Sequence, residues 1–185
     1  DGTIGAGWTE APSGVWMATV WRDGTYAWIV PDLGLGQNVS ALANAINADG
    51  SVIVGEWYNA PAARRDAARW DWNGTSYDLT PLGVLPGTPQ TFIARVWAAS
   101  VSDDGSIIVG TNRFNNNGPF SVQTGFVWTA EGGMRDIEDV LADYGLAFPT
   151  GHWATDLTVS PDGSSIGIIT LNVETPGLLD YTSYL

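Results

Sequence analysis

The sequence contains no cysteine and only one histidine, His152. Without cysteine the chain can form neither a disulfide framework nor a thiolate site. One histidine is too few for the usual zinc sites, and a Ser-His-Asp triad would depend on that residue alone. The sequence therefore predicts no catalytic residues, no metal site and no bound cofactor, and it favours a protein that is not an enzyme.

Positive charge is also scarce, because the chain has no lysine and its 7 basic residues are all arginine. Against 20 acidic residues the formal net charge is −13. A field of this sign repels phosphate backbones and anionic membrane surfaces, so we expect no nucleic acid partner. No apolar run of about 18 residues is present, so we also expect no membrane insertion. Because the chain starts inside a repeat phrase, we expect any export signal to lie upstream.

The residues that are abundant indicate a folded protein made of short strands. Hydrophobic residues make up 44% of the chain and charged residues 15%, which is typical of a chain with a packed core. The 23 glycines and 10 prolines predict many turns between strands. For the 10 tryptophans, packing between sheets is a simpler explanation than ten ligand contacts.

A short phrase built around Asp-Gly recurs four times along the chain. Its aspartates are Asp1, Asp49, Asp104 and Asp162, separated by 48, 55 and 58 residues. Self-similarity at this period is typical of a propeller or a solenoid. The aspartates themselves are best explained as turn formers, because a carboxylate accepts backbone hydrogen bonds while the following glycine takes a positive φ.

Each repeat predicts four short strands. In the second repeat, strands are expected at 51–58, 67–72 and 76–79, with loops at 59–65 and 80–90 and a hairpin turn at Asn73-Gly74. A strand at 92–102 then leads to the next Asp-Gly turn. The same plan predicts further strands at 17–21, 26–30, 40–47, 124–128, 134–137 and 153–160. Trp21, Trp70 and Trp128 occupy the same place in the central hairpin.

Two segments depart from this plan. Residues 134–144 have apolar side chains at helical spacing, with Gly145 able to end a helix, so we predict a short inserted helix there. The fourth repeat is cut short, with a strand at 165–173 and a degenerate strand within 175–185. The acidic face of the helix is most simply a solvated surface.

Several phrases of the chain resemble the HAF repeat of secreted bacterial proteins. They are the phrases at 43–55 and 99–110, the strand residues Phe126–Trp128 and the phrase Gly-Met-Arg-Asp-Ile at 133–137. This resemblance covers nearly the whole chain and implies four-stranded blades in a β-propeller and an extracellular location. It supplies no catalytic motif. The repeats here are fewer and less equal than in the fuller family pattern, and no translocating barrel follows them.

We therefore expect an all-β fold: a β-propeller-like array of about three and a half four-stranded blades in one domain, 1–185. The repeats are 1–48, 49–103, 104–161 and 162–185, and the array is expected to belong to a longer or partner-completed propeller.

The expected function is extracytoplasmic, non-catalytic contact with other protein chains of a larger assembly. One alternative is a carbohydrate- or cell-surface-binding module that uses rim tryptophans; Trp8 and Trp57 follow the repeat turn in matching positions and are either packed or exposed for this purpose. A second alternative is part of a secreted hydrolase, although the spacing of the carboxylates singles out no pair.

Overall fold

The chain folds into β-strands joined by short turns, as seen in a computed structural model that describes residues 3–29, 40–88, 95–115 and 121–173. Within these ranges there are 13 strands, one α-helix and one 3-10 helix. The prediction of an all-β fold is confirmed. The degenerate strand expected within 175–185 lies outside the described residues, as does Asp1.

Repeats 1–48, 49–103 and 104–161 each contain four strands along the sequence, but the hydrogen-bonded sheets group these strands differently. The first sheet contains β1 (Ile4–Glu10), β2 (Trp16–Arg22) and β3 (Thr25–Trp28). Two complete antiparallel meanders follow, and the last sheet is a pair. Their strands are β4 (Ala41–Ile46), β5 (Val52–Asn59), β6 (Arg64–Trp72) and β7 (Tyr77–Gly83), then β8 (Arg95–Val101), β9 (Ile107–Asn115), β10 (Ser121–Thr129) and β11 (Gly133–Asp136), then β12 (His152–Val159) and β13 (Ile166–Asn172).

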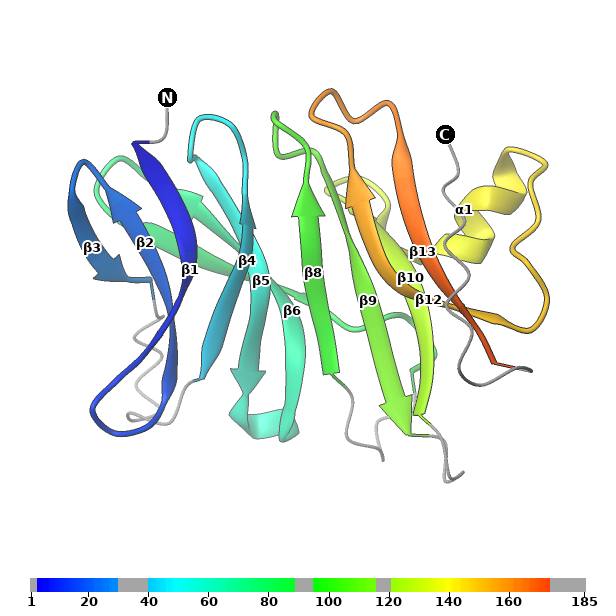
Figure 1. Cartoon of the computed structure of the whole chain (residues 1–185), viewed down its shortest axis with the longest axis horizontal. Coiled ribbons are helices and arrows are strands. Elements are labelled where there is room, and N and C mark those ends of the chain that lie inside the picture. The colour runs from blue at the N-terminus through cyan, green and yellow to red at the C-terminus, as the bar shows by residue number, and fades with distance from the viewer. Residues whose placement is uncertain (1–2, 30–39, 89–94, 116–120, 174–185) are drawn as a thin grey trace.

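We call these four groups of strands units one to four. The turn-entering strands β4, β8 and β12 lead into an Asp-Gly turn, and β1, β5, β9 and β13 are the turn-leaving strands. Units two and three are joined at one point, where Arg65 and Arg95 form a parallel bridge. Figure 1 shows the four units side by side in chain order, from β1–β3 on the left to β12, β13 and the helix on the right.

Each pair of neighbouring units buries its own hydrophobic cluster. Between units one and two the cluster includes Ala18, Val20, Ile53 and Trp70. The next cluster is built around Val54, Ile108 and Phe126, and the third around Val109, Ile137, Leu157 and Ile168. Because the inner units have neighbours on both sides, their strands are apolar on both faces, as in Val52–Val54, which are all buried.

A repeated contact fixes how one unit lies on the next. A Cβ on turn glycine Gly50 would be 2.7 Å from Ile4 Cδ1, and one on Gly105 would be 2.7 Å from Val52 Cγ2. Gly163 lies against Ile107 in the same way, at 3.0 Å. Each turn thus docks on the first residue of the preceding turn-leaving strand, so the three interfaces within the chain are built alike.

Both loops predicted in the second repeat are shorter than expected, because Asn59 belongs to β5 and both Arg64 and Arg65 belong to β6. Residues 80–83 were expected in a loop but belong to β7, which reaches Gly83 because the pairing shifts between Ala67 and Ala68 of β6. The proline of this segment, Pro81, is tolerated because β7 is an edge strand.

The inserted helix is confirmed but is shorter than expected. Helix α1 spans Ile137–Asp143, because the Asp136 side chain accepts the N–H of Glu138 and caps its start. The 3-10 helix η1 (Ala60–Ala62) lies in the predicted loop before β6.

Candidate functional site

The turn aspartates make hydrogen bonds within their own turns. In each described turn the carboxylate accepts the backbone N–H of the residue two positions further on, at 2.8 to 3.0 Å (Ser51, Ser106 and Ser164). The hydroxyls of Ser102 and Ser160 also donate to Asp104 and Asp162, at 2.7 Å. These hydrogen bonds lower the pKa of Asp104 and of Asp162 to about 2, with the serine hydroxyl as the largest cause. The carboxylates therefore hold the turns.

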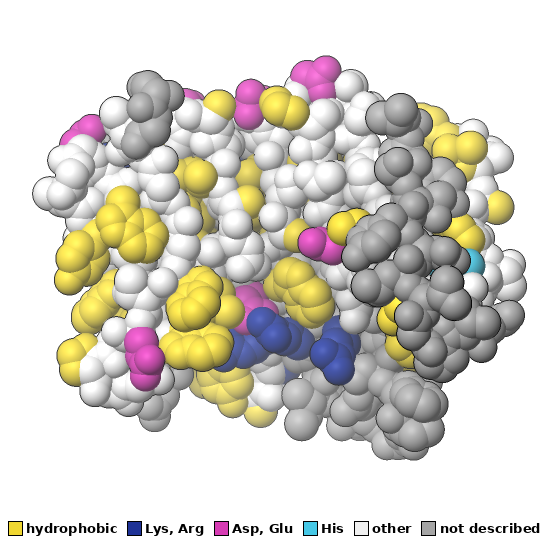
Figure 2. Space-filling view, viewed as in Figure 1, with side chains coloured by type: hydrophobic (Ala, Val, Ile, Leu, Met, Phe, Trp, Pro, Cys, Tyr) yellow, Lys and Arg dark blue, Asp and Glu magenta, His cyan; other side chains and the backbone are white. Residues whose placement is uncertain are grey.

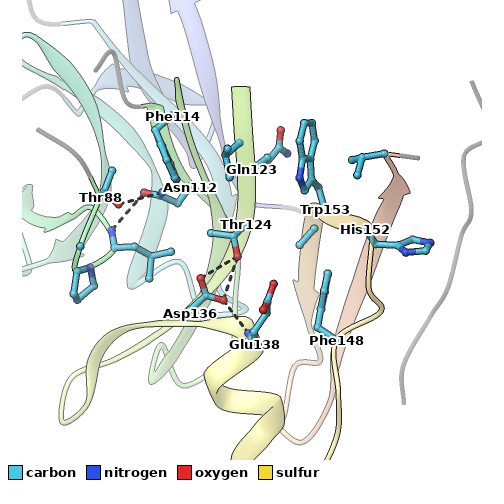
Figure 3. Close-up of a pocket in the computed structure, with 17 residues that line it drawn as sticks. Thr88, Asn112, Phe114, Gln123, Thr124, Asp136, Glu138, Phe148, His152 and Trp153 are labelled. Atoms are coloured by element: carbon cyan, nitrogen blue, oxygen red, sulfur yellow. Dashed lines mark hydrogen bonds between the residues drawn. The ribbon is translucent and has the colours of Figure 1, made fainter. Parts of the chain in front are cut away.

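A pocket of about 510 Å³ lies between units three and four beside the start of α1. It brings together two carboxyl groups, Asp136 and Glu138, and the aromatic rings of Phe148 and Trp153 (Figure 3). Burial raises the pKa of Asp136, and burial together with the charge of Asp136 raises that of Glu138. Sequence spacing had not identified this pair, since the strand-to-helix junction places it.

The hydrogen bonds of this pocket limit its chemistry. Asp136 accepts the Thr124 hydroxyl, at 3.0 and 3.1 Å, as well as the N–H of Glu138, at 2.9 Å. These contacts hold the carboxylate as a helix cap. Figure 3 shows His152, the only histidine, turned away from both carboxyl groups. Its ring Nδ1 lies 2.9 Å from Thr150 O. This histidine is therefore not placed to act with either acid.

Three of the seven arginines meet where the ends of β6, β8 and β9 come together. Arg95 is paired with Arg113 in the β8–β9 register and with Arg65 in the parallel bridge. Figure 2 shows basic side chains crossing the lower middle of this face. Glu56, which is fully buried, accepts Arg95 at 2.8 and 3.0 Å and Arg65 at 3.2 Å. The hydrogen bonds that Arg95 donates to Glu56 raise the pKa of Arg95. Glu56 therefore neutralises part of this charge within the sheet.

The first unit presents an exposed aromatic surface. Trp21, Tyr26 and Trp28 extend from the face of β2 and β3 opposite to Ala18 and Val20, which pack against unit two. We call this surface the outer face. Figure 2 shows large hydrophobic side chains gathered on the left of the molecule, where unit one lies. Exposed aromatic groups of this size are typical of interaction surfaces.

The outer face corresponds to a buried face in the other units. Trp70 in β6 has the position of Trp21 in its hairpin, and Trp128 in β10 has it in unit three. Trp70 is 0% exposed because Ala18 and Val20 of the preceding unit cover it, whereas Trp21 is 40% exposed. Phe126, the neighbour of Trp128 on the same face, is also fully buried. Unit two thus buries the face that unit one exposes, and unit three buries Phe126 completely and Trp128 in part.

The outer face includes a shallow pocket of about 390 Å³. Its walls are formed by the three aromatic rings together with Thr9, Glu10 and Pro12. The Trp28 Nε1–H donates to Thr9 Oγ1 at 3.0 Å, which fixes the indole across β1. The pocket combines flat apolar rings with a carboxylate and a hydroxyl at its edge.

The interpretation of Trp8 and Trp57 as matching positions is wrong. Trp8 aligns with Glu56 and Trp57 with Thr9, because the two tryptophans differ by one residue in their distance from the turn. A shift of one residue turns a side chain to the other face of a strand. Trp57 is buried in the cluster between units one and two. Trp8 is half exposed and stacks on Trp16, with ring centroids 4.9 Å apart.

Metal and membrane sites are judged by the residues that the structure describes. Within them, no group of three or more histidine, aspartate or glutamate residues could hold a metal ion. No helix in the same ranges is long and apolar enough to cross a membrane.

Sequence reasoning missed Tyr26 and Trp28 as surface residues. The signal was available, since Trp21, Tyr26 and Trp28 share one face when the Asp23-Gly24 hairpin is paired with period 2. What the sequence could not show was whether another unit covers this face. Comparisons with protein families, with curated proteins and with solved structures found no match for this chain.

Proposed function

We propose that this protein is a non-catalytic, extracytoplasmic β-propeller-like module that binds another protein of a larger assembly through the outer face. The observation that carries the proposal is the contrast between Trp70, which a preceding unit buries completely, and Trp21, which is 40% exposed. The partner surface is a β-sheet that packs on unit one as unit one packs on unit two.

The interfaces within the chain support this choice of partner. Neighbouring units repeat the same docking of a turn glycine on the preceding strand, at Gly50, Gly105 and Gly163. Arginines strengthen two of these contacts, because Arg22 donates to Gly50 O and Arg69 donates to Gly105 O. Repeat proteins extend by adding units through one kind of interface, so an open unit face favours a further unit of the same kind.

Charge and sequence pattern support the remaining parts of the proposal. A net charge of −13 favours soluble protein partners over nucleic acid. The resemblance to HAF repeats favours an extracytoplasmic location and a curved array of blades. Three successive interfaces of similar construction support an array, because repeat proteins extend through one kind of interface.

The test uses two matched substitutions of exposed tyrosines. Tyr26→Arg places a charge on the outer face, and Tyr144→Arg places the same charge at the far end of the molecule, after α1. Both side chains are well exposed, 65% and 79%, so neither substitution should change the thermal melting. The molar mass of the native protein, and of any complex that it forms, is measured by size-exclusion chromatography with light scattering and by intact mass.

We expect the unchanged protein to be recovered in a stoichiometric complex with another polypeptide. Tyr26→Arg should weaken this complex about tenfold or more, while Tyr144→Arg leaves it unchanged. A protein that travels alone at 19.7 kDa, or a complex equally sensitive to both substitutions, would contradict the proposal.

A second candidate function is carbohydrate binding in the outer-face pocket. The pocket itself favours it, because Trp21, Tyr26 and Trp28 offer flat rings beside Glu10 and Thr9, which can hydrogen-bond sugar hydroxyls. Titration with neutral oligosaccharides, followed by tryptophan fluorescence, tests this candidate. Saturable quenching that Trp28→Phe abolishes would support sugar binding, and an unchanged spectrum would exclude it.

A further inference from the structure

Two of the interfaces between units contain an arginine that holds the turn of the following unit. Arg22 of unit one donates to Gly50 O at 3.0 Å, and Arg69 of unit two donates to Gly105 O. Each guanidinium also lies over a tryptophan ring of the following unit, 4.6 and 5.8 Å from the ring centroid. The third interface has valine and threonine of β10 at these positions. The two arginines can therefore be compared directly.

These two arginines differ in their counter-ions. Arg69 Nε donates to both carboxylate oxygens of Asp71, at 2.8 and 3.0 Å, and Arg69 Nη2 lies 2.7 Å from Asp71 Oδ1. Among the described residues no carboxylate forms an ion pair with Arg22. Arg22 itself occupies the place that Asp71 has in its hairpin, and the place of Arg69 is taken by Val20. Unit one thus supplies the guanidinium without the carboxylate.

Part of the Arg22 guanidinium has no acceptor in the described part of the chain. Its Nη2 donates to Gly50 O and to Tyr77 Oη, at 3.0 and 2.9 Å. Its Nε is buried without a hydrogen-bond partner, and no described residue accepts from its Nη1. A buried donor of a charged group is costly to leave unpaired. Such a donor indicates an acceptor that comes from another molecule.

Arg22 lines a pocket of about 300 Å³ between the β2–β3 hairpin and the turn that joins β6 to β7. Thr75 and Ser76 contribute hydroxyl groups to this pocket. Ser76 Oγ accepts Asn73 Nδ2 at 3.1 Å, so its own O–H is able to donate to a ligand. None of the described lining residues is acidic, although the chain has 20 acidic residues. Aromatic rings form much of the wall (Trp28, Trp72 and Tyr77).

We propose that this pocket binds a small hydroxylated carboxylate, such as a sugar acid, with the carboxylate on the Arg22 guanidinium. A planar guanidinium suits a carboxylate because several of its N–H groups donate to the two oxygens together. Thr75 and Ser76 would bind the ligand's hydroxyl groups, and the aromatic walls would cover its apolar face. The site is separate from the proposed function, because the pocket lies between units one and two. Trp28 also lines the outer-face pocket, so the test leaves it unchanged.

The test is a calorimetric titration of the intact protein with glucuronate at constant ionic strength, with glucose as the neutral probe. We expect saturable binding of glucuronate and at least tenfold weaker binding of glucose. Arg22→Gln should weaken glucuronate binding about tenfold or more, because the charge-assisted hydrogen bonds are lost. Arg69→Gln is the matched control, since it removes the equivalent contact with Gly105 O and should leave glucuronate binding unchanged.

A second variant keeps Arg22 and fills the place of the ligand's carboxylate. Thr25 is exposed, lies directly opposite Arg22 in the β2–β3 hairpin and lines the pocket. Thr25→Asp would place a carboxylate across the strand pair from the guanidinium, so we expect glucuronate binding to fall about tenfold or more. Four results would overturn the proposal: no saturable binding of glucuronate, equal binding of glucose, equal losses in Arg22→Gln and Arg69→Gln, or undiminished binding in Thr25→Asp.

Discussion

The Asp-Gly turns depend on one carboxylate each. Asp104 is fully exposed to solvent, yet its pKa falls to about 2 because Ser102 Oγ–H and Ser106 N–H donate to the charged form. Asp162 has the same partners in its own turn and the same pKa of about 2. The pKa of Asp49 is lowered as well, by hydrogen bonds from Ser51. Ionised aspartate is thus the form that the turns stabilise.

Stability should therefore depend on pH in the acid range. The folded pKa of Asp104 and Asp162 lies below the ordinary value of 3.8, so their contribution is complete above that value and is lost as pH falls through about 2. We expect the melting temperature of Asp104→Asn/Asp162→Asn to fall less between pH 5 and about pH 2 than that of the unchanged protein. An equal fall of the melting temperature in both proteins over this range would show that the turn aspartates do not cause the acid sensitivity.

Removal of the same carboxylates should also lower stability at neutral pH. Asp104→Ala loses the acceptor for two hydrogen bonds that hold the turn on unit two, where Gly105 contacts Val52. We expect thermal melting a few degrees lower, without loss of the fold. An unchanged melting temperature in both Asp49→Ala and Asp104→Ala would contradict the turn-forming role.

The repeat glycines differ sharply in the space around them, which gives a matched pair of substitutions. Gly55→Ala would place a Cβ 1.9 Å from Leu42 O, so β4 must move away from β5, at a cost of about 2 kcal/mol or more. Gly5→Ala would meet nothing within 4 Å and should leave stability unchanged or slightly higher. Urea unfolding of both variants measures the difference. Equal effects would show that close strand approach is not what selects glycine in β5.

Strands β5, β6 and β8 are linked by a buried carboxylate. Glu56 lies on the β5 face turned towards unit three and accepts both Arg65 and Arg95, thereby connecting the two meanders near their single parallel bridge. Because Arg95 is half exposed, water can partly replace the lost partner if Glu56 is removed. The pair Arg135–Asp143, near the end of α1, is exposed on both sides.

These two ion pairs should therefore contribute very different free energies of unfolding. We expect Glu56→Ala to cost about 1–2 kcal/mol, less than a wholly buried pair, because both arginines keep contact with water. Asp143→Asn should cost less than about 0.5 kcal/mol. Urea unfolding in low and high salt checks both values, and strong salt dependence is expected for neither. A cost for Asp143→Asn equal to that for Glu56→Ala would contradict the role of burial.

The molecule as a whole is a stack of units with an open aromatic end and a strong negative charge. The charge keeps copies apart at neutral pH, since the formal net charge is −13. Near the isoelectric point, about pH 4.1, this repulsion vanishes while the outer face stays apolar. Association between copies should then be governed by the exposed rings of Trp21, Tyr26 and Trp28.

Static light scattering as pH is lowered should show association that begins near pH 4.1. Both Tyr26→Arg and Tyr144→Arg add one positive charge and raise the isoelectric point equally. We expect Tyr26→Arg to reduce the extent of this association clearly, and Tyr144→Arg not to reduce it. Equal association of the two variants would show that charge alone controls it.

The repeat of Asp49, Asp104 and Asp162 was enough to predict the order of strands, the turns and the all-β class. This succeeded because each signal is local: Asp-Gly sets a turn, β-branched residues set a strand, and Asp136 with the following apolar spacing sets α1. The limits of β7 and of α1 were less well predicted, since a pairing shift and a helix cap decide them.

Tertiary structure alone decided which of the equivalent positions are covered. Trp21 and Trp70 have the same place in their hairpins, yet within the described residues only Trp70 has a neighbouring unit above it. Likewise Gly7 and Gly55 share one position, and in the same part of the chain only Gly55 is approached by a backbone oxygen. The carboxyl pair Asp136 and Glu138 meets aromatic rings only because units three and four pack together. Burial and contact depend on what lies beyond a strand's own sequence, so local patterns cannot fix them.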